Sequence, residues 1–290
     1  MIDSKVGILD ILQAKKEGRK LVMVTAYDYP FGSMADEAGV DMVLVGDSLA
    51  MVVLGLNSTV QVTLEMIIHH IKAVRRGCKR PLVVGDMPFM SYNTGIRDAI
   101  INAGRLMKEG GCDAIKLEGG VDFALVVEAI VKAGIPVQGH IGLTPQTAGA
   151  LGGFKMQGKD AAAARKIIDD AKALEAAGAF SIVVEAVPAP LGRLIAGSVA
   201  VPVIGIGAGV DVDGQVLVTH DMVGLFDRFV PKFVKQYTNI RPTIIEAIRT
   251  YGDEVRSSAF PTLKYSFGMS DEAQTELRRS LANQDGQVNG

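Results

Sequence analysis

The chain of 290 residues is longer than most single domains, although a closed α/β barrel commonly reaches about 250 residues as one unit. Its 30 basic and 32 acidic residues leave a net charge of −2, so no overall field favours nucleic acid or an acidic membrane surface as a partner. Apolar residues make up 48% of the chain and 33 residues are glycine, which suits a well-filled core with many tight turns.

The first residues lack the basic-then-apolar pattern of a secretory signal. Asp47 and Asp86 interrupt the most apolar stretches, so none reaches the roughly 20 residues of a membrane helix. Cys78 and Cys112 have no metal-ligand spacing, which favours two free thiols in a reducing compartment. We therefore expect a cytoplasmic protein that binds neither nucleic acid nor a membrane.

In chain order, the first expected element is a helix over residues 4–17, whose apolar residues could plug the lower end of a barrel. Eight short apolar runs follow, and a helical pattern separates most of them. The strands are expected at 21–26, 42–47, 82–86, 114–118, 135–140, 181–186, 202–206 and 215–219. The clearest helices between them are expected at 62–76, 95–109, 123–133 and 160–177.

Eight alternating strands and helices with right-handed crossovers predict a (β/α)₈ TIM barrel, with an extra N-terminal helix and several helices over residues 221–283. The alternative is a doubly wound open sheet. Eight comparable strands and the absence of an early Gly-x-Gly-x-x-Gly turn favour the barrel. We expect one domain over residues 1–283, and a disordered tail over 284–290, where no residues could form a core.

Acidic residues end four of the predicted strands, and they are Asp47, Asp86, Glu118 and Glu185. A charge at the end of a buried strand is costly unless it is paired or bound to a metal, and ligands of parallel α/β folds bind at these strand ends. Such acids can also cap the helices that follow them. Because four acids occupy equivalent ends, we favour a divalent-metal site with a spare acid–base group.

Asp47 and Asp86 both follow a glycine at a strand end, and they are the first candidates for ligands of a hard ion such as Mg²⁺. Glu118 is a third candidate, either as a direct ligand or through water. Lys116 lies two residues before Glu118, so both side chains should face the same side of their strand. Lys116 would then hold a carboxylate or neutralise an enolate, unless the two form a purely structural ion pair.

His140 ends the fifth predicted strand, where it could hydrogen-bond a substrate oxygen or shuttle a proton, or serve only structure. Glu185 is surrounded by apolar residues, which makes it a candidate general base or acid; the alternative is a partner for an internal Arg or Lys. The glycine-rich stretch 205–209 resembles a phosphate-binding loop, but close packing around a substrate would need the same glycines.

Several motifs across residues 20–225 together resemble the ketopantoate hydroxymethyltransferase family of pantothenate synthesis. They lie at residues 25–28, 45–49 with 54–55, 86–92, 116–120, 139–146, 185–188, 205–209 and 220–222. The resemblance implies a barrel of the phosphoenolpyruvate/pyruvate type that assembles into a homo-oligomer, typically a decamer. It also implies transfer of a one-carbon unit from 5,10-methylenetetrahydrofolate to 3-methyl-2-oxobutanoate, which gives 2-dehydropantoate through a Mg²⁺-stabilised enolate.

By position, the resemblance assigns one Mg²⁺ per subunit to Asp47, Asp86 and Glu118. It implies substrate binding by Asp47, Ser48, Asp86, Lys116 and His140, with Glu185 as the proton acceptor.

Two other classes of function remain open at this stage. The first is a Mg²⁺-dependent carbon–carbon lyase or phosphonomutase acting on another 2-oxo acid. Cys78 and Cys112 are predicted at the wrong end of the barrel for a cysteine-dependent lyase, which counts against that class. The second is a catalytically inactive barrel used for binding, and the presence of all four strand-end acids counts against it.

Overall fold

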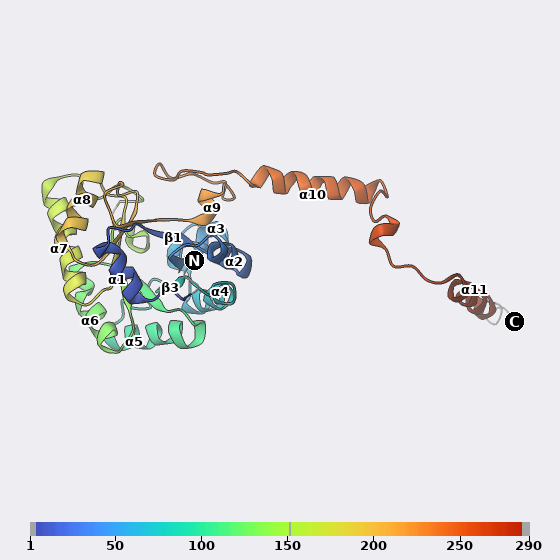
Figure 1. Cartoon of the computed structure of the whole chain (residues 1–290), viewed down its shortest axis with the longest axis horizontal. Coiled ribbons are helices and arrows are strands. Elements are labelled where there is room, and N and C mark those ends of the chain that lie inside the picture. The colour runs from blue at the N-terminus through green and yellow to red at the C-terminus, as the bar shows by residue number, and fades with distance from the viewer. Residues whose placement is uncertain (1–3, 151, 286–290) are drawn as a thin grey trace. The chain divides into compact units, whose positions relative to one another are not determined.

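The computed structural model describes residues 4–150 and 152–285 (Figure 1). The chain divides into two compact units, Met1–Thr238 and Asn239–Gly290. The sequence predicted one domain over 1–283, whereas the structure groups the residues after Thr238 as a unit of their own.

The first unit is a closed barrel of eight parallel strands in sequence order, in which β1 pairs with both β2 and β8. The predicted barrel is therefore confirmed, and the doubly wound sheet is excluded. The strands are β1 Leu21–Thr25, β2 Met42–Val45, β3 Leu82–Asp86, β4 Ala114–Glu118, β5 Val137–Gly142, β6 Ser181–Glu185, β7 Val203–Ile206 and β8 Gly214–Leu217.

Helices lie around the outside of the barrel (Figure 1), and one follows every strand except β7, which leads directly into β8. The α-helices are α2 Tyr29–Glu37, α3 Leu49–Val52, α4 Leu64–Gly77, α5 Ile96–Arg105, α6 Ala124–Lys132, α7 Ala161–Ala176, α8 Ala189–Ser198 and α9 Thr219–Met222. Short helical turns are η1 Thr59–Gln61, η2 Leu106–Gly110 (a π-helical turn), η3 Val121–Phe123 and η4 Pro145–Thr147.

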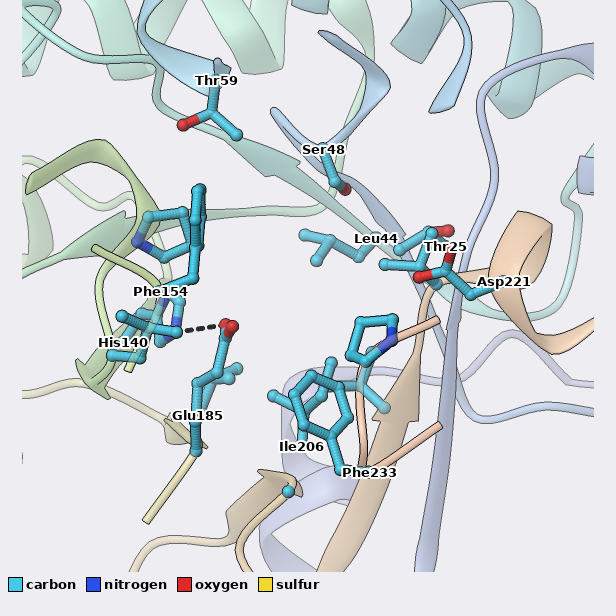
Figure 2. A pocket seen from close by; sticks show the side chains of 18 of the residues that line it. Thr25, Leu44, Ser48, Thr59, His140, Phe154, Glu185, Ile206, Asp221 and Phe233 are labelled. Carbon is cyan, nitrogen blue, oxygen red and sulfur yellow. Dashed lines mark ion pairs between the residues drawn. The ribbon is translucent and has the colours of Figure 1, made fainter. Parts of the chain in front are cut away.

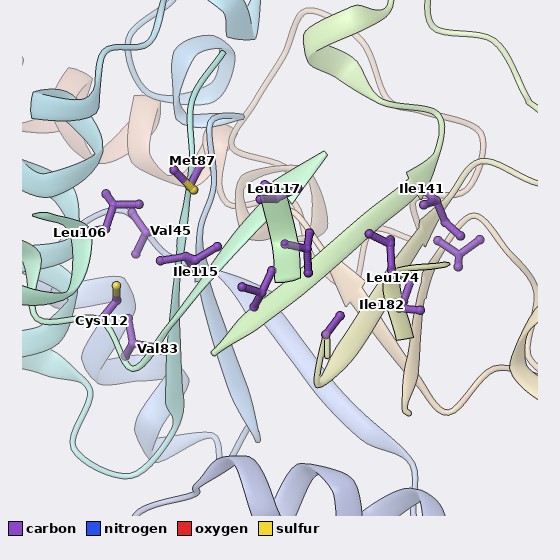
Figure 3. Close-up of a cluster of buried hydrophobic side chains, with 14 of the residues drawn as sticks. Val45, Val83, Met87, Leu106, Cys112, Ile115, Leu117, Ile141, Leu174 and Ile182 are labelled. Carbon is purple, nitrogen blue, oxygen red and sulfur yellow. The ribbon is translucent and has the colours of Figure 1, made fainter. Parts of the chain in front are cut away.

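Alternate residues of each strand belong to two different apolar clusters, as expected for a period of two residues. Val83, Ile115 and Leu117 face the helices and pack against side chains such as Leu106 and Leu174 (Figure 3). Their neighbours in sequence point into the barrel, where apolar residues such as Leu82 fill its lower part. The upper part of the interior is therefore lined by the last inward-facing residue of each strand.

The N-terminal helix α1, Ile8–Lys16, packs against the lower part of the barrel interior. Ile11 and Ala14 of α1, together with Val6, join one buried cluster with the strand residues Leu21 and Leu82. The sequence-based prediction that this helix plugs the lower end agrees with this packing.

The second unit contains two helices, α10 Arg241–Arg256 and α11 Asp271–Asp285, and the short turn η5 Leu263–Tyr265. The tail predicted at 284–290 begins inside α11, and residues 286–290 lie outside the described residues. None of the described helices is long and apolar enough to cross a membrane.

Candidate active site

A cavity of about 820 Å³ opens at the carboxyl ends of the strands (Figure 2). Its floor is polar and its outer wall is largely apolar. All seven site residues selected from the sequence line this one cavity, namely Asp47, Ser48, Asp86, Lys116, Glu118, His140 and Glu185.

The period of the strands explains why these side chains meet. Asp86 follows Leu82 and Val84 at two-residue spacing, and both of these fill the barrel interior, so Asp86 also points inward. The register pairs Asp86 with Lys116 on the next strand. Glu118 is paired in the same way with His140 on β5, which brings four polar groups from three neighbouring strands together.

Lys116 is held by an ion pair with Asp86, and both side chains are almost completely buried. The Nζ atom lies 2.9 Å from Asp86 Oδ1. The other oxygen of Asp86 accepts a hydrogen bond of 3.1 Å from the backbone N–H of Asp47. These contacts fix the Asp86 carboxylate between two strand ends and keep Lys116 directed into the cavity.

The protonation equilibria of the floor reflect crowding of carboxylates. Burial, with repulsion from Asp86 and Glu118, holds the pKa of Asp47 well above its usual value. Burial also raises the pKa of Asp86, although Lys116 opposes the rise. For Lys116, burial alone would lower the pKa, but attraction to Asp86, Glu118 and Asp47 outweighs it and raises the pKa above its usual value. Lys116 is therefore a cation at neutral pH.

His140 lies between two carboxylates. Its Nδ1 is 3.5 Å from Glu118 Oε1 and 3.3 Å from Lys116 Nζ, and its Nε2 is 3.2 Å from Glu185 Oε2 (Figure 2). Burial and Lys116 would lower the pKa of His140, but Glu118 and Glu185 outweigh them and raise it to about 9. The ring is consequently protonated at neutral pH and acts as a second cation of the floor.

Gln146 and Tyr92 are buried next to the floor without lining the cavity, and the sequence predicted no role for either. Gln146 Nε2 donates to Asp47 Oδ2 (2.9 Å), and the Gln146 backbone N–H donates to Glu118 Oε2 (3.0 Å). The Tyr92 hydroxyl donates to Gln146 Oε1 (2.8 Å). Gln146 lies in the turn η4 after β5, so no strand periodicity points to it; its only sequence signal is a polar residue directly after Thr144-Pro145.

Helix capping does not explain the acid at the end of β2. Asp47 is bonded to Gln146, and α3 begins after Ser48 without any side-chain cap. The Ser48 hydroxyl instead forms a 2.8 Å hydrogen bond with the hydroxyl of Tyr27 and lines the cavity.

The floor has the chemistry of a divalent-cation site. Four acidic side chains face only two cations, and crowding raises the pKa of Asp47 and of Asp86. Asp86 Oδ1, which Lys116 pairs with, and Glu118 Oε1 are buried without a well-aligned hydrogen bond. Within residues 4–150 and 152–285, no three His, Cys, Asp or Glu side chains are grouped to hold a metal by themselves. The residues therefore fit a hard ion that takes one or two carboxylates and completes its shell with water or substrate oxygens.

The glycine-rich stretch 205–209 is explained by packing. A Cβ atom at Gly207 would lie 2.8 Å from the ring of Phe233, and one at Gly209 would lie 2.5 Å from Ala189 Cβ. The loop therefore serves close contacts within the protein, and Phe233 is seated on it as part of the cavity wall.

The outer wall is built by apolar side chains from two loops. Phe154 and Met156 come from the segment after β5, while Phe226, Phe229 and Phe233 follow β8. The rings of Phe154 and Phe229 are half-exposed, in contrast to the buried floor. The cavity thus combines a charged base with aromatic sides.

Solved structures with the same fold include a phosphonopyruvate hydrolase in complex with oxalate and Mg²⁺. It has a TM-score of 0.58 and 12% sequence identity, and the match covers 97% of this chain and 98% of that chain. A phosphoenolpyruvate phosphomutase from Streptomyces platensis subsp. rosaceus also has a TM-score of 0.58, at 15% identity and the same coverage. At these identities the likeness establishes the fold alone.

Sequence comparison is more specific. The family model described as ketopantoate hydroxymethyltransferase matches residues 5–263. A 3-methyl-2-oxobutanoate hydroxymethyltransferase of Oleidesulfovibrio alaskensis is 57% identical over 274 residues, which cover 94% of this chain and 95% of that protein. An enzyme of the same name from Moorella thermoacetica is also 57% identical, with coverage of 91% and 98%. The chain therefore belongs to the ketopantoate hydroxymethyltransferase family.

Proposed function

We propose that the chain transfers a hydroxymethyl group from 5,10-methylenetetrahydrofolate to 3-methyl-2-oxobutanoate and forms 2-dehydropantoate in the cavity of the barrel. Family membership supports the overall reaction. The observation that supports the site is the buried row of Asp86, Lys116, Glu118 and His140. This row presents two cations for a small anionic substrate and two carboxylates for a metal ion.

Asp47, Asp86 and Glu118 would hold Mg²⁺, because a hard cation would relieve the repulsion between these crowded carboxyl groups, and Glu118 Oε1 is buried without a hydrogen bond. When bound, the ion would supply positive charge beside the keto oxygen of the substrate, where negative charge develops during proton removal.

Lys116 and Ser48 would bind the 2-oxo acid. The Lys116 ammonium group is fixed by Asp86 and cannot swing away, so it offers a stationary positive charge to the substrate carboxylate. Ser48 presents a hydroxyl whose position is set by Tyr27. His140, as a protonated ring, would place a positive charge beside a substrate oxygen on the same floor.

Glu185 would take the proton from C3 of the keto acid. It ends β6 with its side chain 15% exposed, at the edge of the floor, and His140 Nε2 holds one of its oxygens. Since His140 already carries its proton at neutral pH, it is not free to accept another, and of the two only Glu185 can act as the base. The resulting enolate carbon would form the new bond to the folate methylene carbon. Both C–N bonds to that carbon would break, so that tetrahydrofolate leaves with two protons, one from C3 and one from water, and the remaining hydroxyl of water becomes that of the hydroxymethyl group.

The apolar outer wall would shield the enolate from water until this bond forms. Phe154 and Phe229 are half-exposed at the mouth, where closure over a bound ligand would bury them.

We also propose that the chain self-associates, as the family resemblance implies, into a homodecamer. Ile244, Ile248, Tyr251 and Val255 recur on one face of α10 and are each at least 42% exposed, which supports a contact surface. The cytoplasm would suit the two buried free thiols, Cys78 and Cys112.

A lyase or phosphonomutase acting on another 2-oxo acid is the alternative, since solved relatives of this fold carry such names. Burial raises the pKa of Cys78 to about 11 and that of Cys112 to about 12. Neither thiol lines the cavity, so neither can serve as the acid of a cysteine-dependent lyase.

The deciding experiment incubates the protein with 3-methyl-2-oxobutanoate, methylenetetrahydrofolate and Mg²⁺ and follows 2-dehydropantoate directly. Product should form only when all three are present. Turnover of the keto acid without the folate would instead support the alternative, and no turnover under any of these conditions would contradict the proposed transfer.

A further inference from the structure

Asp221 places an unpaired carboxylate in the wall of the cavity, away from the carboxylates of the floor. It lies in α9 directly after β8 and is only 8% exposed. Its backbone N–H donates to Val218 O, and its backbone carbonyl accepts from Gln236 Nε2. Within the part of the chain that the structure describes, no group donates to the carboxylate itself, and burial alone raises its pKa to about 6.

A carboxylate in this position is costly to the folded protein. A buried carboxylate without a hydrogen-bond partner destabilises a protein unless another group, such as a bound ligand, donates to it. Asp221 lines the cavity, so a bound ligand can reach it. The absence of an internal partner therefore indicates a partner that enters with the ligand.

The surroundings of Asp221 suit a flat ring. Figure 2 shows Asp221 beside Thr25 and Leu44, with Phe233 and Ile206 along the same side and the pair of His140 and Glu185 across the cavity. Phe233 is fixed in place because it packs on the backbone of Gly207. Phe226 and Phe229 extend this aromatic side toward the mouth, with ring centroids 5.6 Å apart.

The two substrates of the proposed reaction differ in how they would meet this wall. The 2-oxo acid is a small anion, which the Asp221 carboxylate repels and the cations of the floor attract. The folate carries a bicyclic ring whose pyrimidine edge presents two N–H donors side by side, at N3 and at the 2-amino group. A carboxylate can accept both hydrogen bonds in parallel, as it does from a guanidinium group.

We propose that Asp221 binds the pyrimidine edge of the folate ring, accepting hydrogen bonds from N3 and the 2-amino group, with Phe233 packed against the ring. This inference rests on the proposed function, because it assumes that the folate enters this cavity. It places the ring along the β8 side and leaves the one-carbon unit free to point toward the keto acid on the floor.

The direct test is the affinity of the full-length protein for tetrahydrofolate, measured by calorimetry for the wild type, Asp221→Asn and Asp211→Asn. Asparagine keeps the size of the side chain but turns an N–H toward a ring donor, so Asp221→Asn should weaken binding about 10- to 100-fold. Asp211 is a matched control: it lies in the segment between β7 and β8, pairs with Arg193 of α8 and does not line the cavity. Asp211→Asn removes the same charge and should leave the affinity within about twofold.

A second measurement needs no variant. A tetrahydrofolate analogue without the 2-amino group should bind the wild type about tenfold more weakly than tetrahydrofolate, while Asp221→Asn should discriminate far less between the two. Binding of 3-methyl-2-oxobutanoate should be retained in Asp221→Asn, which shows that the cavity is intact.

Wild-type affinity of Asp221→Asn for tetrahydrofolate, or equal binding of the two folates by the wild type, would overturn the assignment even if turnover were lost. A wild-type protein that makes 2-dehydropantoate in the same preparation would then confine the failure to Asp221. If the wild type neither binds tetrahydrofolate nor forms the product, the proposed function and this inference fall together.

Discussion

At the edge of the floor, His140 and Glu185 form an ion pair in which the two residues have different proposed roles. The imidazole, with a pKa of about 9, pairs with Glu185, and Glu185 is the proposed proton acceptor. Exchange of the C3 proton of the keto acid requires only this base and the metal, and it can be observed without the folate.

Glu185→Gln should therefore reduce C3 exchange in D₂O by at least about 100-fold, as expected for loss of a general base. The amide has nearly the same shape, so calorimetric binding of Mg²⁺ and of the keto acid should persist. Glu254 is exposed in the second unit, so the Glu254→Gln variant is a suitable control. It should exchange the C3 proton at the wild-type rate. A Glu185→Gln protein that exchanges normally would remove Glu185 from the proton-transfer step.

Gln146 donates hydrogen bonds to the carboxylates of Asp47 and Glu118, so its loss should lower the affinity for metal. Gln146→Ala removes the hydrogen bond to Asp47 and the support that Tyr92 gives to the turn, and it should weaken Mn²⁺ binding about 10-fold or more, as for other groups that orient metal ligands. Free Mn²⁺ measured by electron paramagnetic resonance reports this directly. Gln13→Ala, on the outer side of α1, should bind Mn²⁺ as the wild type does. Unchanged affinity in Gln146→Ala would contradict the positioning role.

The sequence could predict the site residues that lie on strands, because their spacing determines their direction. Two-residue spacing places Lys116 and Glu118 on one face, and the apolar runs before Asp86 and Glu185 mark buried strands. Gln146, Tyr92 and Asp221 come from connections, which have no period. Their positions depend on how the loops pack over the barrel, and no local pattern carries that information.

At the scale of elements, the eight strands were predictable because each is a compact apolar run between helix ends. The sequence-based prediction of these strands differs from the structure only in the residues at which the strands begin and end. β5 begins at Val137 and not at residue 135, since Pro136 has no N–H to donate to the ladder, and it continues to Gly142 beside β6. The sequence alone also allowed the strand-end acids to cap helices. At Asp47 this is excluded by the hydrogen bond from Gln146 and by the start of α3 after Ser48 without a side-chain cap.

The plug formed by α1 should contribute measurably to stability. Ile11 is fully buried among the inner residues of the barrel, so Ile11→Ala should lower the free energy of unfolding by about 2–5 kcal/mol. Leu9 on the same helix is 79% exposed, and Leu9→Ala should change it by less than about 0.5 kcal/mol. Urea denaturation of the two variants provides the comparison. Equal effects would show that α1 is held only loosely.

At the scale of the whole molecule, the second unit presents an apolar stripe that the proposed assembly would cover. Ile248 and Tyr251 lie on this stripe of α10 and are 65% and 57% exposed. The wild type should sediment as a large oligomer, and Ile248→Glu should shift it toward smaller species because a buried unpaired charge opposes association. Arg249→Glu changes the neighbouring residue, which lies off the stripe, and should sediment as the wild type does. A monomeric wild type would contradict the assembly.

The closed lower end of the barrel has a consequence for the order of events in turnover. Because α1 fills that end, both substrates and both products must use the mouth between the aromatic loops. A small acid seated on the floor would lie beneath a larger ring held along the wall, so the deeper ligand should enter first and leave last. Initial-rate kinetics should then be sequential and ordered, with 2-dehydropantoate competing against 3-methyl-2-oxobutanoate for the free protein, and tetrahydrofolate departing before it.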